Sequence, residues 1–205
     1  MRQSLFSGRF INAVAALTFV CALSFSAFAT TNNKTFAGVS IDNFGQVNDH
    51  IYRGAQPKDS QYRELAALGV KTVVDLRGDA KRESQASAER AGLRYINLPL
   101  EDKSYPQTDA AARFLQIVSD PDNGVVYVHC AGGRHRTGAM VAVYRMDVDH
   151  WTIAQAYDEM KQYDFYTSGG HGCYKDYVYD HYNALQAGLN TEAAAGQVQQ
   201  VAGVK

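Results

Sequence analysis

Residues 129–138 place a cysteine, two adjacent glycines and two arginines within one short segment, His-Cys-Ala-Gly-Gly-Arg-His-Arg-Thr-Gly. A cysteine that faces a helix N-terminus and an arginine ionises readily, so Cys130 is expected to be a thiolate nucleophile at neutral pH. Arg136 follows it closely, and its planar guanidinium can bind two phosphoryl oxygens at once. The segment therefore predicts nucleophilic attack by Cys130 on a phosphate ester.

The backbone of this segment, residues 130–136, is expected to bind the phosphate group and is called the phosphate loop below. Adjacent glycines let the N–H groups turn inward as an anion nest, and the dipole of the following helix favours negative charge there. The residues expected to line the bound phosphate are Ala131, Gly132, Gly133, Arg134, His135 and Arg136. Thr137 can donate its hydroxyl to the Cys130 sulfur and stabilise the thiolate when the phosphocysteine breaks down.

The elements on either side of the phosphate loop determine where it lies. Residues 125–128 are a continuous apolar run bounded by turn residues, which is typical of a strand buried on both faces of a parallel sheet. A helical pattern begins near Thr137. Ligands of α/β folds bind between the carboxyl end of such a strand and the amino end of the next helix, and the phosphate loop occupies this position.

The remainder of the chain alternates between short apolar strands and helical patterns. Further strands are expected at residues 51–53, 70–76 and 95–98. Helices are expected at residues 57–68, 80–91, 137–148, 152–162 and 175–187, with another that Thr108 or Asp109 caps and that ends before Asp120. This order predicts an α/β fold in which a central, mostly parallel sheet is flanked by helices on both faces.

The motif His-Cys-x-x-Gly-x-x-Arg-Thr-Gly at residues 129–138 resembles the signature of the cysteine-based protein tyrosine phosphatase superfamily, in its compact dual-specificity branch. The segments Tyr-Arg-Gly-Ala-Gln-Pro at 52–57 and Thr-Val-Val-Asp-Leu-Arg at 72–77 are similar to a bacterial dual-specificity-like subfamily. The resemblance covers about residues 45–165. It implies the fold of these phosphatases and hydrolysis of phosphate monoesters through a phosphocysteine, with no metal ion and no cofactor.

Hydrolysis also requires an acid that protonates the departing oxygen. In the superfamily an aspartate takes this role, on a loop between an earlier strand and the nucleophile strand. Residues 98–106 (Leu-Pro-Leu-Glu-Asp-Lys-Ser-Tyr-Pro) resemble that loop. We expect Asp102 to be the general acid, with Glu101 and Asp109 as alternatives, although Asp109 also suits a helix cap.

Several polar residues near these motifs are expected to support the fold instead of the chemistry. His129 ends the buried strand and faces away from the expected phosphate, so it is expected to orient the phosphate loop. Asp75 and Arg77 are expected to pair with each other. Arg53 and Gln56 are also assigned to the scaffold, although they belong to a segment that resembles the subfamily.

The charge around the phosphate loop bears on the substrate. Arg134, His135 and Lys103 are candidate cations at its rim, whereas Ala131 and Gly132 stand where relatives that hydrolyse inositol polyphosphates often have basic residues. A phosphotyrosine carries one dianion, whereas an inositol polyphosphate requires a cation for each further phosphate. We therefore expect a protein-tyrosine or dual-specificity phosphatase. An inositol polyphosphate or phosphoinositide phosphatase, or a pseudophosphatase that binds phosphate without turnover, are the alternatives.

The N-terminus has the pattern of a secretory signal. Arg2 and Arg9 precede an uncharged, largely apolar run over residues 10–28, and a small-x-small pattern ends at Ala29. Cleavage there would leave 18 basic against 21 acidic residues, a net charge of −3. We expect export to the periplasm or beyond, without stable membrane insertion, and an uncleaved N-terminal anchor helix is the alternative.

The expected organisation is a signal peptide at residues 1–29, an N-terminal extension at 30–44, a phosphatase domain at 45–187 and a flexible C-terminal tail at 188–205. With 46% hydrophobic residues and a net charge of −1 over 205 residues, the chain is neither disordered nor basic enough for a dedicated nucleic-acid binder. The expected partner is a phosphorylated protein or a small phosphoester. Cys130 and Cys173 remain after signal removal, and an oxidising compartment would allow a disulfide between them.

Overall fold

The computed structural model describes residues 38–202 of the chain, and the side chains of residues 38–188. Within this part, one sheet has the strand order β1-β2-β5-β3-β4. Its strands are β1 (Gly45–Gln46), β2 (Ile51–Gly54), β3 (Thr72–Arg77), β4 (Arg94–Leu100) and β5 (Val126–His129). β1 is antiparallel to β2, and every other pair is parallel. The mostly parallel sheet predicted from the sequence is confirmed.

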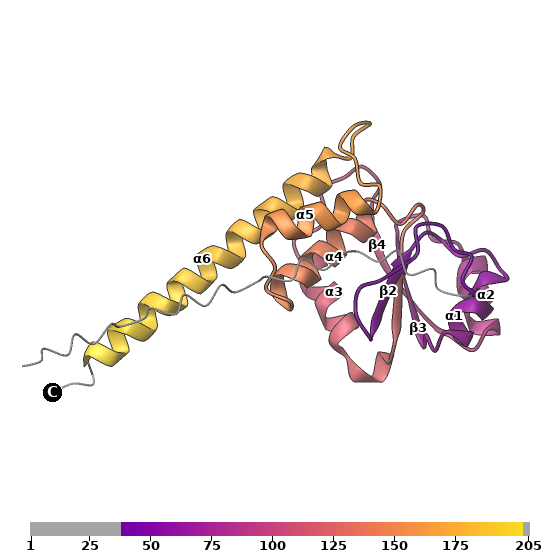
Figure 1. Ribbon diagram of the computed structural model, residues 1–205, viewed down its shortest axis with the longest axis horizontal. Helices are drawn as coiled ribbons and strands as arrows, with labels where there is room; N and C mark the ends of the chain where they lie inside the picture. Colours follow the sequence, from indigo (N-terminus) through magenta and orange to yellow (C-terminus); the bar gives the residue numbers. More distant parts are fainter. Residues whose placement is uncertain (1–37, 203–205) are drawn as a thin grey trace, which may run out of the picture. The chain divides into compact units, whose positions relative to one another are not determined.

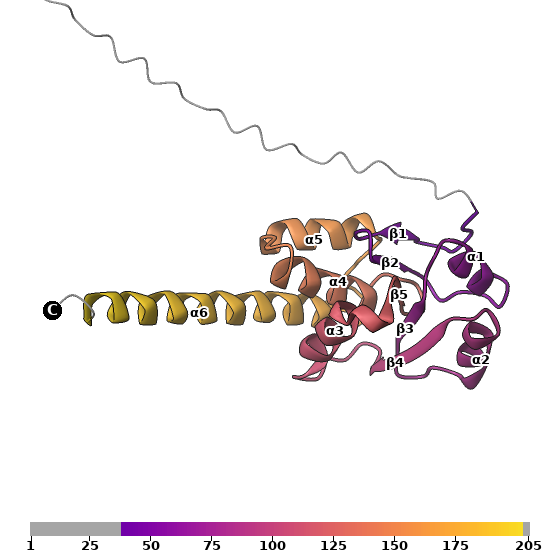
Figure 2. The ribbon, with the colours of Figure 1, turned by 90° about the horizontal axis from the view of Figure 1, so that it is seen from below.

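Helices cover both faces of this sheet (Figures 1 and 2). They are α1 (Gln61–Ala67), α2 (Arg82–Arg90), α3 (Ala110–Ser119), α4 (Arg136–Asp147), α5 (Ile153–Gln162) and α6 (Gly172–Ala202), with a 3-10 turn at Pro121–Asn123. Figure 2 shows α1 and α2 on one face, and α3, α4, α5 and the first part of α6 on the other. The predicted layering of helices around the sheet is therefore also confirmed.

The central strand β5 explains why residues 125–128 are apolar throughout. Val126 and Val128 are fully buried in the core beneath α3, α4, α5 and α6, whereas Tyr127 is fully buried in the second core beneath α1 and α2. β5 lies between β2 and β3 in the sheet, so neither edge is open. A strand covered on both faces requires apolar side chains on both, and its end is consequently held rigidly.

Several element boundaries differ from the sequence prediction. α1 begins at Gln61, not at residue 57, and α6 begins at Gly172 and continues to Ala202, beyond the expected end at residue 187. β4 continues to Leu100, so Pro99 lies in a strand and not in the expected loop. Proline is tolerated here because β4 is an edge strand and its register with β3 shifts between Asn97 and Leu100, as at a β-bulge.

The first described residues pack onto the domain. Ile41 is buried, the Ala55 N–H donates to the Asp42 carbonyl at 2.9 Å, and Ser40 bonds to the Glu64 carboxylate. Residues 38–44 were assigned from the sequence to an extension that precedes the domain. The predicted signal, residues 1–29, lies outside the described residues. In the described part of the chain, no helix has the length and apolar character needed to cross a membrane.

Candidate active site

The phosphate loop connects β5 to the N-terminus of α4, as the sequence predicts. Gly133 has φ of +68°, and a Cβ on it would lie 2.4 Å from the Gly54 carbonyl carbon. A side chain at position 133 is therefore excluded both by the backbone conformation and by the close approach of β2. The Gln56 N–H donates to the Ala131 carbonyl at 3.0 Å, which joins the segment after β2 to the start of the loop.

A buried arginine supports the phosphate loop from beneath. Arg53 is 0% exposed, its Nη2 donates to the Gly133 carbonyl at 3.0 Å, and its guanidinium lies 3.8 Å from the centre of the Tyr163 ring. Asn43 Nδ2 donates to the Gly132 carbonyl at 3.3 Å and to the Tyr163 carbonyl at 3.1 Å. The Gly132 and Gly133 carbonyls point toward Asn43 and Arg53. The N–H groups of the loop can therefore face the opposite side, where the phosphate is expected. This buried position beneath the loop agrees with the scaffold role expected for Arg53.

Cys130 lies at the base of the phosphate loop and is 3% exposed. It lines a small cavity of about 190 Å³ together with Asp102, Ala131, Gly132, Arg134, His135, Arg136, Tyr166 and His171. Apart from Gly133, every residue expected from the sequence to bind phosphate thus borders the cavity that contains the nucleophile. Tyr166 and His171 were not predicted, because they come from the connection between α5 and α6, about forty residues later in the chain.

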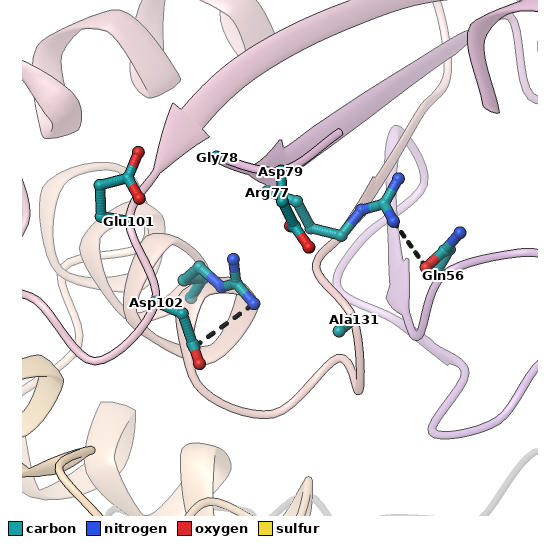
Figure 3. A pocket seen from close by; sticks show the side chains of 8 residues that line it. Gln56, Arg77, Gly78, Asp79, Glu101, Asp102 and Ala131 are labelled. Carbon is teal, nitrogen blue, oxygen red and sulfur yellow. Dashed lines mark hydrogen bonds and ion pairs between the residues drawn. The ribbon is translucent and has the colours of Figure 1, made fainter. Parts of the chain in front are cut away.

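Asp102 lies at the mouth of the site and faces the loop arginine. Its Oδ1 is 3.4 Å from Nη2 of Arg136, and the two side chains are 51% and 8% exposed (Figure 3). Arg136 Nη1 also donates to the Leu100 carbonyl at 3.4 Å. Both Asp102 and Arg136 line the Cys130 cavity and an adjoining cavity of about 380 Å³. A half-exposed carboxyl group thus lies beside the guanidinium expected to hold the phosphate.

The two alternative acids lie elsewhere. Glu101 lines the adjoining cavity but not the cavity of Cys130, and its carboxylate lies against Gly78, where a Cβ would be 2.6 Å from Oε1. Asp109 is at the N-cap position of α3 but makes no capping hydrogen bond, and its carboxylate instead lies 3.8 Å from Arg113. Of the three candidates, Asp102 is the one that borders the cavity of the nucleophile.

Thr137 is fully buried in the first turn of α4. Its Oγ1 makes no hydrogen bond with any atom of the described residues. The hydrogen bond to the Cys130 sulfur that the sequence predicts is thus not formed. The hydroxyl occupies the first helical turn next to the phosphate loop, and its role when the phosphocysteine breaks down stays a prediction.

His135 is neutral at physiological pH, which removes one of the candidate rim cations. Burial, and next the neighbouring His171, lower the pKa of His135 to about 4. The two rings are stacked with their centres 3.6 Å apart, and the Tyr166 ring meets His135 edge-on at 4.4 Å. Arg134 lies 3.7 Å from Asp164, with both side chains well exposed. Lys103, the third candidate rim cation, borders neither cavity, so Arg134 is the one of the three that is charged and borders the Cys130 cavity.

The pair expected from Asp75 and Arg77 is present and buried. Arg77 donates to both carboxylate oxygens of Asp75, with the shortest contact at 2.6 Å, and also to Gln56 at 2.6 Å. Burial acts to raise the pKa of Asp75, but the hydrogen bonds from Arg77, and next the electrostatic interaction with His129, hold it below its ordinary value. His129 is fully buried behind the loop, where burial lowers its pKa, and its Nδ1 lies 3.1 Å from the Cys130 carbonyl.

Neither cysteine takes part in a disulfide, since Cys130 and Cys173 are both free thiols. The Cys173 thiol donates to the Gly170 carbonyl at 3.4 Å, and burial raises its pKa. Among the described residues, no group of three or more His, Cys, Asp or Glu side chains is arranged to hold a metal ion.

Residues 20–178 match a family model described as a DSP-PTPase phosphatase fused to NAD+ kinase. The dual specificity protein phosphatase TpbA of Pseudomonas aeruginosa is 29% identical over 123 residues, which cover 60% of this chain and 55% of TpbA. The crystal structure of P. aeruginosa TpbA superposes with a TM-score of 0.59 at 27% identity, covering 72% of this chain and 92% of that structure. The residues matched by the family model include every residue of the candidate site described above.

Other relatives differ in the substrates that their names state. The "Probable tyrosine-protein phosphatase DG1060" of Dictyostelium discoideum is 28% identical over 126 residues, which cover 59% of this chain and 75% of that protein. The inositol diphosphatase DSP4 of Arabidopsis thaliana is 26% identical over 126 residues, covering 59% of this chain and 63% of that protein. The chain thus spans less than two thirds of the length of TpbA and DSP4, and the similar proteins include both tyrosine and inositide phosphatases.

Proposed function

This chain belongs to the DSP-PTPase family of cysteine-based phosphatases, and on that premise we propose that it hydrolyses phosphate monoesters through a phosphocysteine on Cys130. The observation that carries the proposal is that Asp102 and Arg136, 3.4 Å apart, both border the cavity at whose base Cys130 lies. A nucleophile, a phosphate-binding guanidinium and a proton donor are thereby brought to one opening.

In the proposed first step, the Cys130 thiolate attacks phosphorus and the bond from phosphorus to the leaving oxygen breaks. The loop N–H groups and Arg136 stabilise the charge on the equatorial oxygens, as donors aimed at a transition state do. Asp102, protonated at the start, gives its proton to the leaving oxygen. In the second step Asp102 takes a proton from water, which attacks the phosphocysteine and releases phosphate and the thiolate. Thr137 would donate a hydrogen bond to that sulfur.

We further propose that the preferred substrate carries a single phosphate on an aromatic arm, as phosphotyrosine does. The rim near Cys130 contains the Tyr166 ring and the stacked rings of His135 and His171, against which a phenyl group can pack. The charged residues that line the adjoining cavity are the carboxylates Asp79, Glu101 and Asp102, the phosphate-loop residue Arg136, and Arg77, which is paired with Asp75. A second phosphate placed there would meet negative charge.

The second candidate function is hydrolysis of an inositol polyphosphate or pyrophosphate. It is supported by the similarity to the A. thaliana inositol diphosphatase. Against it stands the small number of rim cations, because His135 is neutral and Arg134 lies near Asp164. The pseudophosphatase alternative is disfavoured because Cys130 and Arg136 are both in place, and a module that only binds phosphate has no need of the nucleophile.

The experiment that tests the proposal measures phosphate release in chelator from a phosphotyrosine peptide, a phosphoserine peptide, inositol hexakisphosphate and a phosphoinositide. Highest efficiency is expected on the phosphotyrosine peptide. Cys130→Ser should abolish turnover and keep phosphate binding, because a serine without an adjacent base is not ionised at neutral pH. Arg136→Lys should also lose most of the rate, since an ammonium cannot make the bidentate contact. Retained activity in Cys130→Ser would refute the covalent mechanism.

We also propose that the protein is exported and that its signal is cleaved after Ala29. The support is the order of a positive N-terminus, an apolar run and a small-x-small pattern in residues 1–29. Mass spectrometry of the protein purified from its native host should give a chain that begins at Thr30. A chain that retains Met1 and sediments with membranes would favour the uncleaved anchor.

A further inference from the structure

The loop that carries Asp102 has a backbone conformation that needs support. Lys103, the next residue, has φ of +56°. Residues other than glycine, asparagine and aspartate seldom adopt this left-handed backbone conformation. Such a conformation costs free energy and persists only where the surroundings enforce it. The Asp102 side chain itself is half exposed and has the single contact with Arg136 at 3.4 Å. The support must therefore act on the backbone.

The hydroxyl of Tyr174 provides this support. It accepts a hydrogen bond from the Lys103 N–H at 3.1 Å and donates one to the Glu101 carbonyl at 2.9 Å. These two groups belong to the residues immediately before and after Asp102, so one oxygen atom fixes the backbone on both sides of the expected acid. Tyr174 is 0% exposed, and burial raises its pKa to about 12, so the hydroxyl remains a donor at neutral pH.

The ring of Tyr174 also contacts the other half of the site. Its centre lies 6.2 Å from that of His135 in the phosphate loop and 6.4 Å from that of His171, with the planes nearly parallel. The same side chain thus packs beside the phosphate loop and bonds to the acid loop. Because Tyr174 is in the first turn of α6, the relative position of the two loops depends on where this helix begins.

We propose that Tyr174 is a positioning residue for general acid catalysis: its hydroxyl holds the backbone on both sides of Asp102, so that the carboxyl group stays within reach of the leaving oxygen. This inference rests on the proposed function, because it takes Asp102 as the acid. Tyr174 does not border the cavity of Cys130, and its hydroxyl bonds to the backbone on either side of Asp102, whereas its ring lies near His135 and His171. Loss of the hydroxyl with the ring retained should therefore affect the two proton transfers of Asp102, and protonation of the leaving group is the one whose loss depends on the substrate.

The test compares Tyr174→Phe with the wild type on two substrates. On an alkyl phosphate, whose leaving group requires the proton, kcat/KM should fall by about 10-fold, the scale expected from losing one or two buried hydrogen bonds. On an aryl phosphate with a very acidic phenol, kcat/KM, which reports on formation of the phosphocysteine and not on its hydrolysis, should change by less than about 3-fold, since little protonation is needed. In an Asp102→Asn background, Tyr174→Phe should have no further effect on the alkyl phosphate.

Tyr105→Phe is the matched control. Tyr105 is on the same loop, and its hydroxyl donates to Asp180 Oδ2 of α6 at 2.9 Å, but it does not bond to the backbone next to Asp102. This variant should leave both rates nearly unchanged. If Tyr174→Phe does not fold, 4-fluorophenylalanine at position 174 fills the volume of the hydroxyl without donating a hydrogen bond, and the same selective loss is expected.

Three results would overturn the inference: an equal loss on both substrates, an undiminished loss in the Asp102→Asn background, or an equal loss from Tyr105→Phe. Each would mean that Tyr174 supports the fold in general. If Asp102→Asn is itself silent, the assignment of the acid and the role of Tyr174 both fail. Cys130-dependent turnover by the wild type reports separately on the proposed function, so the two failures are distinguishable.

Discussion

The Asp75–Arg77 pair and the Asp102–Arg136 pair join the same two residue types at the same end of the sheet, yet their surroundings are opposite. Asp75 and Arg77 have side chains that are 0% and 5% exposed, with Nη2 of Arg77 at 2.6 Å from Oδ2 of Asp75. Asp102 and Arg136 approach to only 3.4 Å, and the Asp102 side chain is 51% exposed. The Asp75–Arg77 pair is closely hydrogen-bonded and buried, whereas the Asp102–Arg136 pair has one longer contact and is open to solvent on the Asp102 side.

Hydrogen-bond partners account for the difference. The Asp75 carboxylate accepts from Arg77 and from the Tyr95 hydroxyl, which is 2.6 Å from Oδ2. Both oxygens of the Asp75 carboxylate already accept hydrogen bonds. Protonating it would break these bonds and leave a buried guanidinium without its counter-charge. Asp102 has one loose partner and is half exposed, which is the setting that the proposed acid requires. The two pairs share their residue types, and burial and the number of partners distinguish the buried pair from the pair proposed to take part in catalysis.

The largest expected effect comes from removing the exposed carboxylate. Asp102→Asn should lower kcat on alkyl phosphates by roughly 10²–10⁴-fold, the usual scale of general acid catalysis. The free energy of unfolding should change by less than about 0.5 kcal/mol, as for surface substitutions. Steady-state rates and chemical denaturation measure the two quantities. Glu101→Gln serves as the control, and a larger loss from that variant would move the acid to Glu101.

The buried pair should respond in the opposite way. Asp75→Asn leaves the Arg77 guanidinium buried without its counter-charge, which should cost about 3–5 kcal/mol of stability. The folded fraction at low temperature should retain a large part of its kcat, because Asp75 lies behind the phosphate loop. Denaturant titration and rates normalised to folded protein check this. If the stability were unchanged and kcat collapsed, the two pairs would have been assigned the wrong way round.

The pH dependence of stability should separate the pairs more finely. The pKa of Asp75 is held below its ordinary value, so its stabilisation is present above the unfolded pKa of about 3.9 and is lost as pH falls through the folded value. Below about pH 4 the wild type should lose up to about 1.4 kcal/mol per pH unit from this group. Asp75→Asn should lack that increment, whereas Asp102→Asn should retain it.

The smallest effect is expected for the third pair, Arg134–Asp164, which is exposed on both sides. Arg134→Ala should cost less than about 1 kcal/mol of stability, as exposed ion pairs do. Efficiency on a phosphotyrosine peptide should fall only modestly, and its salt dependence should be weak. The opposite result would favour the inositide function: faster turnover of inositol hexakisphosphate than of the peptide, with a salt dependence that Arg134→Ala removes.

Local sequence determined the phosphate loop. Cys130, the glycines and Arg136 lie within one turn between a buried strand and a helix, so their spacing alone brings them together. The order of strands and helices likewise determined the α/β class, because apolar runs and helical periodicity are properties of single segments. These predictions depended on contacts between residues close in the chain. Boundaries were less accurate, as the extension of β4 through Pro99 illustrates.

Only the tertiary structure decided which distant residues complete the site. Asn43, Tyr166, His171 and Tyr174 reach the two loops from segments far from Cys130, and nothing in their own sequence neighbourhoods distinguishes them from packing residues. The same holds for charge: His135 is next to an arginine in the sequence, but the stacked His171 and burial keep it neutral. Whether a titratable side chain is a cation, a scaffold or an acid depends on burial and partners, which the fold assembles from separate parts of the chain.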